Sequence, residues 1–302
     1  MLHKNSFFDT MHKYLYLLTV CFICLIVSPT VTAQVKLPQA SPAAFIKQTI
    51  GLTDISVKYH APGVKGRKVF GELVPYGKLW RAGANEATLI TFTDELFLNH
   101  ERVPAGTYSF FILPESDSVW NVVLNRDTTL WGLEGYDELE DVAYLRVKPE
   151  KVAFQETMNF TFSDIGTNTG FLHMTWENSR ISLRVETEIE KKALENIKTA
   201  LASAAPDDWY TWALCADFMI PRKEHHLKAL EWINKSIAIK ETFFNNWVKA
   251  KLYAQNKEYE MAAQLTAKAM KLGKQEPEAQ EDYKTYERDI ITAHNAWKKR
   301  KL

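Results

Sequence analysis

The chain has 302 residues, of which 46% are hydrophobic and 25% are charged; these values are ordinary for a folded protein and exclude wholesale disorder. Lysine and arginine together number 37, as do aspartate and glutamate, so no net charge draws the chain to nucleic acid or to an anionic membrane surface. The length allows two domains.

The N-terminal segment has the features of an export signal, which we predict over residues 1–33. Basic side chains precede an apolar run from Tyr14 to Val27, and the small residues at 31–33 suit cleavage before Gln34. A membrane-spanning helix needs about 20 apolar residues, so this run favours a cleaved signal over the alternative, an N-terminal membrane anchor. The segment predicts a periplasmic or extracellular protein that has no membrane contact after cleavage.

Cysteine usage agrees with a fold that does not depend on disulfides. Cleavage would remove Cys21 and Cys24 and leave Cys215 of the three cysteines. We expect Cys215, which stands beside Ala216 in an apolar pattern, to be a small buried residue rather than a nucleophile.

From Ala43 to about Glu186, apolar and polar side chains alternate, which is the period of a half-buried β-strand and predicts a β domain over residues 34–187. Ile55, Val57 and Tyr59 are the clearest example, and turn signals divide the segment at roughly 8–12 residue intervals. Because no long helical pattern interrupts these strands, we predict an antiparallel all-β sandwich of about nine strands rather than a parallel α/β sheet. The later expected strands are Val142–Val147, Glu156–Phe162, Phe171–Trp176 and Ile181–Val185.

After residue 187 the spacing of apolar residues changes to three and four, which predicts an all-α domain over residues 188–302. Leu194, Ile197 and Leu201 share one face of the first expected helix. Six helices in antiparallel pairs are the simplest arrangement, with the fifth ending at Gly273.

The helical segment also contains a weak internal repeat. Ala229 and Ser236 have counterparts in Ala262 and Ala269 about 33 residues later, the period of a tetratricopeptide repeat. Such repeats usually offer a concave face to a peptide or protein partner. The alternative is a helical bundle that covers one end of the sandwich.

Motifs with a known catalytic mechanism are absent from the sequence. It has no Gly-x-Ser-x-Gly turn, no His-Glu-x-x-His motif, no phosphate-binding glycine loop and no pair of Cys-x-x-Cys motifs. His173 and Glu177 fall on one face of a strand, but two ligands do not make a metal site, and we expect a solvated face there. His225 and His226 begin a helix and are expected at the surface. We therefore predict no catalytic residue, no metal and no cofactor.

The stretch from Phe70 to Thr88 is the best candidate for a binding site, because it is too polar for a core strand and too aromatic for a plain linker. Its guanidinium and amide groups suit a small polar ligand, and aromatic rings can form a stacking wall. The alternative is that Arg81 and Glu86 pair with each other or with backbone carbonyls, while Trp80 fills the sandwich. The acidic run from Glu134 to Asp141 is expected to be a solvated loop. The candidate ligand-binding residues are Arg67, Tyr76, Trp80, Arg81, Asn85, Glu86 and Trp131.

Several sequence blocks in this region resemble the domain of unknown function 2911 (DUF2911) family, and they occur in the order typical of it. They include Leu73-Val74-Pro75-Tyr76-Gly77, then Trp80-Arg81, then Gly83-Ala84-Asn85-Glu86-Ala87-Thr88. The resemblance covers about Val35 to Val185 and implies an exported bacterial protein, of a kind that sometimes carries a tetratricopeptide-like tail. The family loop commonly has threonine where this chain has Ala82. The resemblance implies no activity.

Together these observations predict an exported, non-enzymatic binding or interaction module with a polar and aromatic pocket on the sandwich and a partner-binding helical tail. The alternative is a hydrolase or lyase of cell-envelope glycan or peptide that uses Glu86 with a second carboxylate or a histidine.

Overall fold

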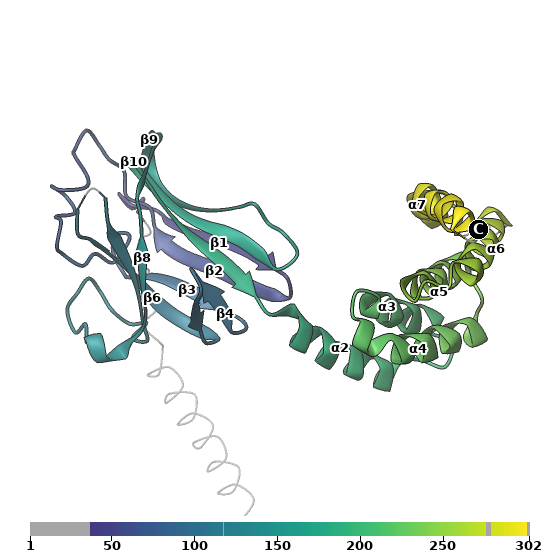
Figure 1. Cartoon of the computed structure of the whole chain (residues 1–302). Helices are drawn as coiled ribbons and strands as arrows, with labels where there is room; N and C mark the ends of the chain where they lie inside the picture. Colours follow the sequence, from purple (N-terminus) through teal and green to yellow (C-terminus); the bar gives the residue numbers. More distant parts are fainter. Residues whose placement is uncertain (1–36, 117, 276–278, 301–302) are drawn as a thin grey trace, which may run out of the picture. The chain divides into compact units, whose positions relative to one another are not determined.

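A computed structural model of the protein describes residues 37–116, 118–275 and 279–300 (Figure 1). The predicted export signal and two of the three cysteines, Cys21 and Cys24, lie outside these ranges. Within them, no helix combines the length and the apolar character needed to cross a membrane.

Ten antiparallel strands form two sheets, which confirms the predicted all-β sandwich (Figure 1). The six-stranded sheet has the order β1 (Ala43–Ile50), β2 (Thr53–His60), β3 (Thr88–Phe92), β6 (Gly106–Pro114), β7 (Trp120–Asn125) and β8 (Asp141–Val147). The four-stranded sheet has the order β5 (Glu101–Val103), β4 (Leu96–Leu98), β10 (Thr169–Thr187) and β9 (Glu150–Ser163).

One hydrophobic core joins the two sheets. Ile55, Val57 and Tyr59 of β2 are buried in it, as their alternation predicted. Trp120 from the six-stranded sheet and Trp176 from the four-stranded sheet are among its largest fully buried side chains. Removal of these apolar surfaces from water is the main force that holds the sheets together.

Strand β10 folds back on itself at its middle. Glu177 has a left-handed backbone with φ 54°, and the backbone N–H of Thr187 donates to the carbonyl of Asn168 at 2.8 Å. The two arms correspond to the two strands expected at Phe171–Trp176 and Ile181–Val185. The first arm and the residues just after the turn pair with β9, and the end of the second arm pairs with β4.

His173 lies between these arms and is buried, in contrast to the expected solvated face. Its Nε2 is 2.7 Å from Oγ of Ser163, and its Nδ1 is 2.8 Å from Oγ of Ser182. Burial lowers the pKa of His173, and the positive charge of Arg180 lowers it further. Two hydroxyl partners therefore hold a neutral imidazole inside the sheet.

We expect His173 to make the protein less stable in mild acid. The unfolded chain takes up a proton near pH 6.5, whereas the folded chain does so only at lower pH, so the free energy of unfolding falls as the pH drops through this window. Between the two pKa values, the free energy of unfolding falls by at most about 1.4 kcal/mol per pH unit. Urea denaturation at pH 7.5, 6.5 and 5.5 should show this loss in the wild type and a smaller one in His173→Gln, with the exposed His100→Asn as control. Parallel pH profiles for wild type and His173→Gln would contradict the assignment.

Six α-helices follow the sheets among the described residues, as predicted. They are α2 (Ile189–Ser203), α3 (Trp209–Met219), α4 (His226–Ile239), α5 (Phe243–Gln255), α6 (Tyr259–Gln275) and α7 (Gln280–Lys299). Of two short 3-10 helices in the described ranges, η1 (Glu138–Glu140) lies between β7 and β8 and η2 (Lys223–His225) between α3 and α4. Polar caps begin two of the helices: the Asp208 side chain accepts from the N–H of Thr211, and Thr242 forms a capping box with Asn245.

The end of α6 differs from the prediction. Gly273 was expected to stop the helix, but α6 continues to Gln275. Gly273 is buried in the helix, and a Cβ at this position would overlap with Cγ and Cδ2 of Tyr283 on α7. The glycine therefore allows two helices to approach each other rather than ending one of them.

The helices enclose a hydrophobic core of their own. Cys215 on α3 is buried in it, as predicted. Burial raises the pKa of this thiol, and the charge of Asp208 raises it further. The four repeat positions at 229, 236, 262 and 269 are all fully buried, on α4 and α6. The tetratricopeptide assignment itself stays a prediction.

Candidate functional site

Three polar side chains meet where β2 ends. Two of them, Asn85 and Glu86, belong to the stretch from Phe70 to Thr88, which we call the candidate loop. The Nε2 atom of His60, the last residue of β2, lies 2.9 Å from Oε2 of Glu86. The Nδ2 atom of Asn85 lies 2.9 Å from the other ring nitrogen, Nδ1. The His60 side chain is only 13% exposed, whereas the Glu86 side chain is 58% exposed. The structure thus brings two of the predicted residues, Asn85 and Glu86, onto one histidine.

The loop that holds this cluster is fixed by its own backbone. The hydroxyl of Thr88 donates to the carbonyl of Ala82 at 2.8 Å, and the N–H of Ala84 donates to the carbonyl of His60 at 3.3 Å. A Cβ at Gly83 would lie 2.9 Å from Oγ1 of Thr88 and 3.1 Å from the carbonyl oxygen of His60. Asn85 has a left-handed backbone with φ 58°, a conformation that asparagine tolerates better than most residues. The loop is therefore a preformed turn.

Trp80 is partly buried and packs against the core of the sandwich. Its indole stacks on Trp176 with ring centroids 5.5 Å apart, and it meets the edge of Phe70. Its backbone N–H and carbonyl both pair with Ile112 at 2.8 Å, and its Nε1–H donates to the carbonyl of Gly83 at 3.2 Å. Most of this ring faces protein, so it has little surface left for a stacking wall.

Arg81 is half-buried and incompletely paired. Its Nε is buried and has no hydrogen-bond partner within the described part of the chain. Burial lowers the pKa of its guanidinium. A desolvated cation of this kind is stabilised by a carboxylate or phosphate oxygen, which can take two of its N–H groups at once.

Arg67 and Tyr76 lie in other turns. The guanidinium of Arg67 donates from Nε to the carbonyl of Val64 at 3.0 Å and from Nη2 to the carbonyl of Gly63 at 2.8 Å, so it stabilises its own turn. The ring of Tyr76 lies against Gly71, where a Cβ would be 3.0 Å from its Cε2. The contacts of these two side chains therefore lie within their own turns.

The segment that connects β7 to β8, residues 126–140, contacts the candidate loop. The N–H of Ala87 donates to the carbonyl of Leu130 at 3.0 Å, and both residues are buried in a small apolar cluster with Phe111 and Val123. Trp131, the next residue, is 62% exposed. The two loops are therefore neighbours, and they present Trp131 to solvent.

The acidic run in this segment is largely exposed, as expected for a solvated loop, and hydrogen bonds order it. The hydroxyl of Tyr136 donates to Oδ2 of Asp141 at 2.6 Å, and Nδ2 of Asn125 donates to Oδ1 of the same carboxylate at 2.8 Å. The side chain of Asp137 caps η1 by accepting from the N–H of Leu139. These contacts fix the end of the segment where it enters β8.

The cluster at His60 can orient or move a proton, because its imidazole contacts a solvent-exposed carboxylate. The sequence did not identify His60 as the partner of Glu86. The hydrolase alternative required a second carboxylate or a histidine near Glu86 but named no residue. The signal that singles out His60 is its place at the last position of a strand, where side chains meet the loops that return to the sheet.

The helical part contains a second candidate, a groove of about 880 Å³ at the ends of five helices. Its walls are formed by the first turns of α3 and α5, the first two turns of α7, the residue that follows α4 and the last residue of α6. Tyr210 is 48% exposed, and its ring contacts Phe244, which in turn contacts Tyr286. The lining residues are Trp209, Tyr210, Lys240, Thr242, Phe243, Phe244, Gln275, Ala279, Asp282 and Tyr286.

Comparison with known proteins identifies the β part of the chain. The family model described as "Protein of unknown function (DUF2911)" matches residues 41–185, which begin just before β1 and end within β10. No curated protein and no solved structure matches the chain. The sandwich, residues 41–185 of this chain, belongs to the DUF2911 family.

Proposed function

We propose that this protein is an exported, non-enzymatic binding module whose helical part, residues 188–302, holds a peptide segment of a partner protein. The observation that carries this proposal is the groove at the helix ends. Its volume, about 880 Å³, is in the range of ligand sites, and its aromatic walls can bury apolar side chains. We further propose that residues 34–187 form a separate domain, whose half-buried Arg81 offers a second contact to an anionic group.

The charges of the groove favour a peptide over a simple anion or a lipid. Lys240 and Asp282 both line it, and neither side chain has an ion-pair partner among the described residues. A peptide supplies both signs of charge together with apolar side chains. Tyrosine and tryptophan are also the residues that most often dominate the binding energy of protein interfaces.

We expect a phage-displayed library of linear peptides to yield sequences that share an aromatic or aliphatic anchor and bind this groove. Tyr210→Ala should lower the affinity for a synthetic peptide with one of these sequences about tenfold or more. A tenfold loss of affinity corresponds to about 1.4 kcal/mol. Fluorescence polarisation measures the affinity. Lys240→Glu should lower the affinity for peptides that carry an acidic residue and leave the affinity for the other peptides unchanged.

The matched control is Tyr144→Ala, because Tyr144 is 55% exposed on β8 and does not line the groove. It should leave the affinity unchanged. If Tyr210→Ala and Lys240→Glu bound the selected peptides as tightly as the wild type does, the groove would not be the binding site.

The contact between Glu86 and His60 favours one alternative, a hydrolase or lyase of envelope glycan or peptide. A carboxylate and an imidazole 2.9 Å apart provide the acid and base that such a reaction needs. Two features make this alternative weaker than the binding module. Both ring nitrogens of His60 already contact a protein group, and glycosidases use two carboxylates rather than a carboxylate and a histidine. This alternative requires release of glycan or peptide fragments from cell-wall material by the wild-type protein.

A further inference from the structure

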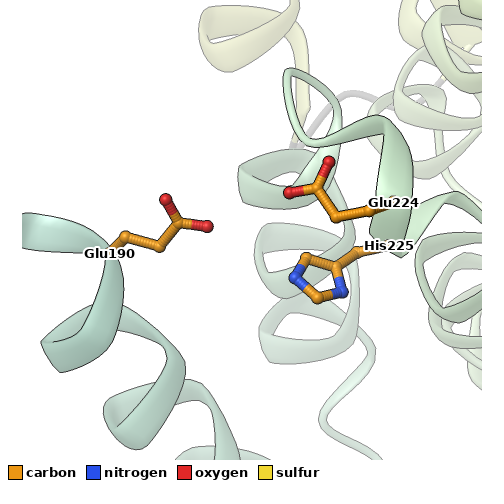
Figure 2. Close-up of side chains that lie close together, drawn as sticks. All are labelled: Glu190, Glu224 and His225. Atoms are coloured by element: carbon orange, nitrogen blue, oxygen red, sulfur yellow. The ribbon is translucent and has the colours of Figure 1, made fainter.

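Three metal-ligating side chains converge in the helical part, away from the groove. They are Glu190 in the first turn of α2, and Glu224 and His225 of η2 (Figure 2). One ligand atom from each lies within 4.8 Å of the others. Figure 2 shows Glu190 reaching across from one helix toward the carboxylate and imidazole on the other side. The sequence did not suggest this cluster, because Glu190 is far from the other two residues along the chain.

The surroundings position one ligand and leave the others available. Nε of Arg222 lies 3.4 Å from Oε1 of Glu190, while the Arg222 guanidinium stacks on Phe218 and donates to its carbonyl at 2.7 Å. Glu190 is thereby held by a cation that is itself anchored. Within the described residues, the side chains of Glu224 and His225 have no hydrogen-bond or ion-pair partner.

We propose that Glu190, Glu224 and His225 bind one divalent transition-metal ion of the Zn²⁺ type. Two carboxylates and one imidazole match the donors that Zn²⁺ accepts, at about 2.0–2.2 Å from the metal, and small side-chain rotations can bring atoms 4.8 Å apart to such a centre. The imidazole nitrogen disfavours Ca²⁺ and Mg²⁺, which prefer oxygen ligands, and the absence of a thiolate from the set disfavours Cu⁺.

A metal at this position would fasten two elements that are separate in sequence. Glu190 is on α2, whereas Glu224 and His225 immediately precede α4. The ion would add a bridge between these helices to the apolar contacts that α2 makes through Leu194 and Ile197. It would also relieve the repulsion between the two carboxylates, because the single charge of Arg222 does not neutralise both. Three protein ligands leave a further coordination position for water.

The test is titration of the full, tag-free protein with ZnCl2 by isothermal calorimetry, followed by thermal denaturation with and without the metal. We expect one saturable site per chain and a higher melting temperature with Zn²⁺, because a metal bound by the folded state alone stabilises it. Ca²⁺ and Mg²⁺ should raise the melting temperature less. Co²⁺ should give visible absorption bands that report its coordination.

Variants of the ligands identify the site. His225→Ala and Glu224→Gln should each weaken Zn²⁺ binding about tenfold or more and change the Co²⁺ spectrum, since loss of even a supporting partner costs 10–100-fold in affinity. Both residues are outside the helical core, so the variants should fold. His100→Asn removes an exposed histidine elsewhere and should bind as the wild type does. No saturable binding by the wild type, or equal binding by all four proteins, would overturn the proposal.

Discussion

Replacing Trp80 with alanine is expected to lower the free energy of unfolding of the sandwich by about 3 kcal/mol or more. The indole stacks on Trp176 and contacts Phe70, and its N–H donates to the carbonyl of Gly83, so the change leaves a cavity and an unpaired carbonyl together. Urea denaturation followed by near-ultraviolet and far-ultraviolet circular dichroism measures the loss.

Trp131→Ala is the matched control for this experiment. Trp131 stands in the neighbouring loop and is 62% exposed, so its removal should change stability by no more than about 0.5 kcal/mol. If the two substitutions had equal effects, Trp80 would not be a core residue. The predicted stacking role would then regain support, because a ring that forms a ligand wall is free to solvent before binding.

Replacing Gly273 with alanine is expected to destabilise the helical part by about 1–3 kcal/mol, the usual effect of overpacking. In an ordinary helix the same change would stabilise by about 1 kcal/mol, because glycine is a poor helix former. Here the new methyl group would overlap with the buried ring of Tyr283, so α6 and α7 would have to move apart. Thermal and urea denaturation, followed by circular dichroism at 222 nm, show whether the substitution lowers or raises the free energy of unfolding.

A double-mutant cycle separates the steric effect from helix propensity. In a Tyr283→Leu background the ring is gone, so Gly273→Ala should become neutral or stabilising. Lys274→Ala, at an exposed neighbouring position, should have a small effect in either background. A stabilising effect of Gly273→Ala in the wild type would show that the two helices are not closely packed at this point.

The sequence predicted the strands and helices well wherever one face of an element is buried. The alternation of Ile55, Val57 and Tyr59 identified β2, and the expected strands Phe171–Trp176 and Ile181–Val185 correspond to the two arms of β10. Strand β5 was missed because it has three residues, two of them exposed and charged. Such a segment shows no period that distinguishes it from a loop.

Packing and long-range pairing limited the prediction of the site. Gly273 has the residue type of a helix stop, and only the distance to Tyr283 reveals its packing role. Asn85 and Glu86 were singled out as polar loop residues, but they contact His60, which lies at least 25 positions earlier in the chain, and these contacts depend on how β2 and β3 pair. Residue types indicate what a side chain can bind, whereas the choice of partner is decided by the fold.

The buried position of Cys215 has a consequence for the export that we propose, because an exported protein would enter an oxidising compartment. Burial and the nearby charge of Asp208 raise the pKa of its thiol, so little of the reactive thiolate forms. Mixed disulfides arise by attack of a thiolate on an accessible sulfur. We therefore expect that folded copies do not cross-link through Cys215, because the helical core covers its sulfur.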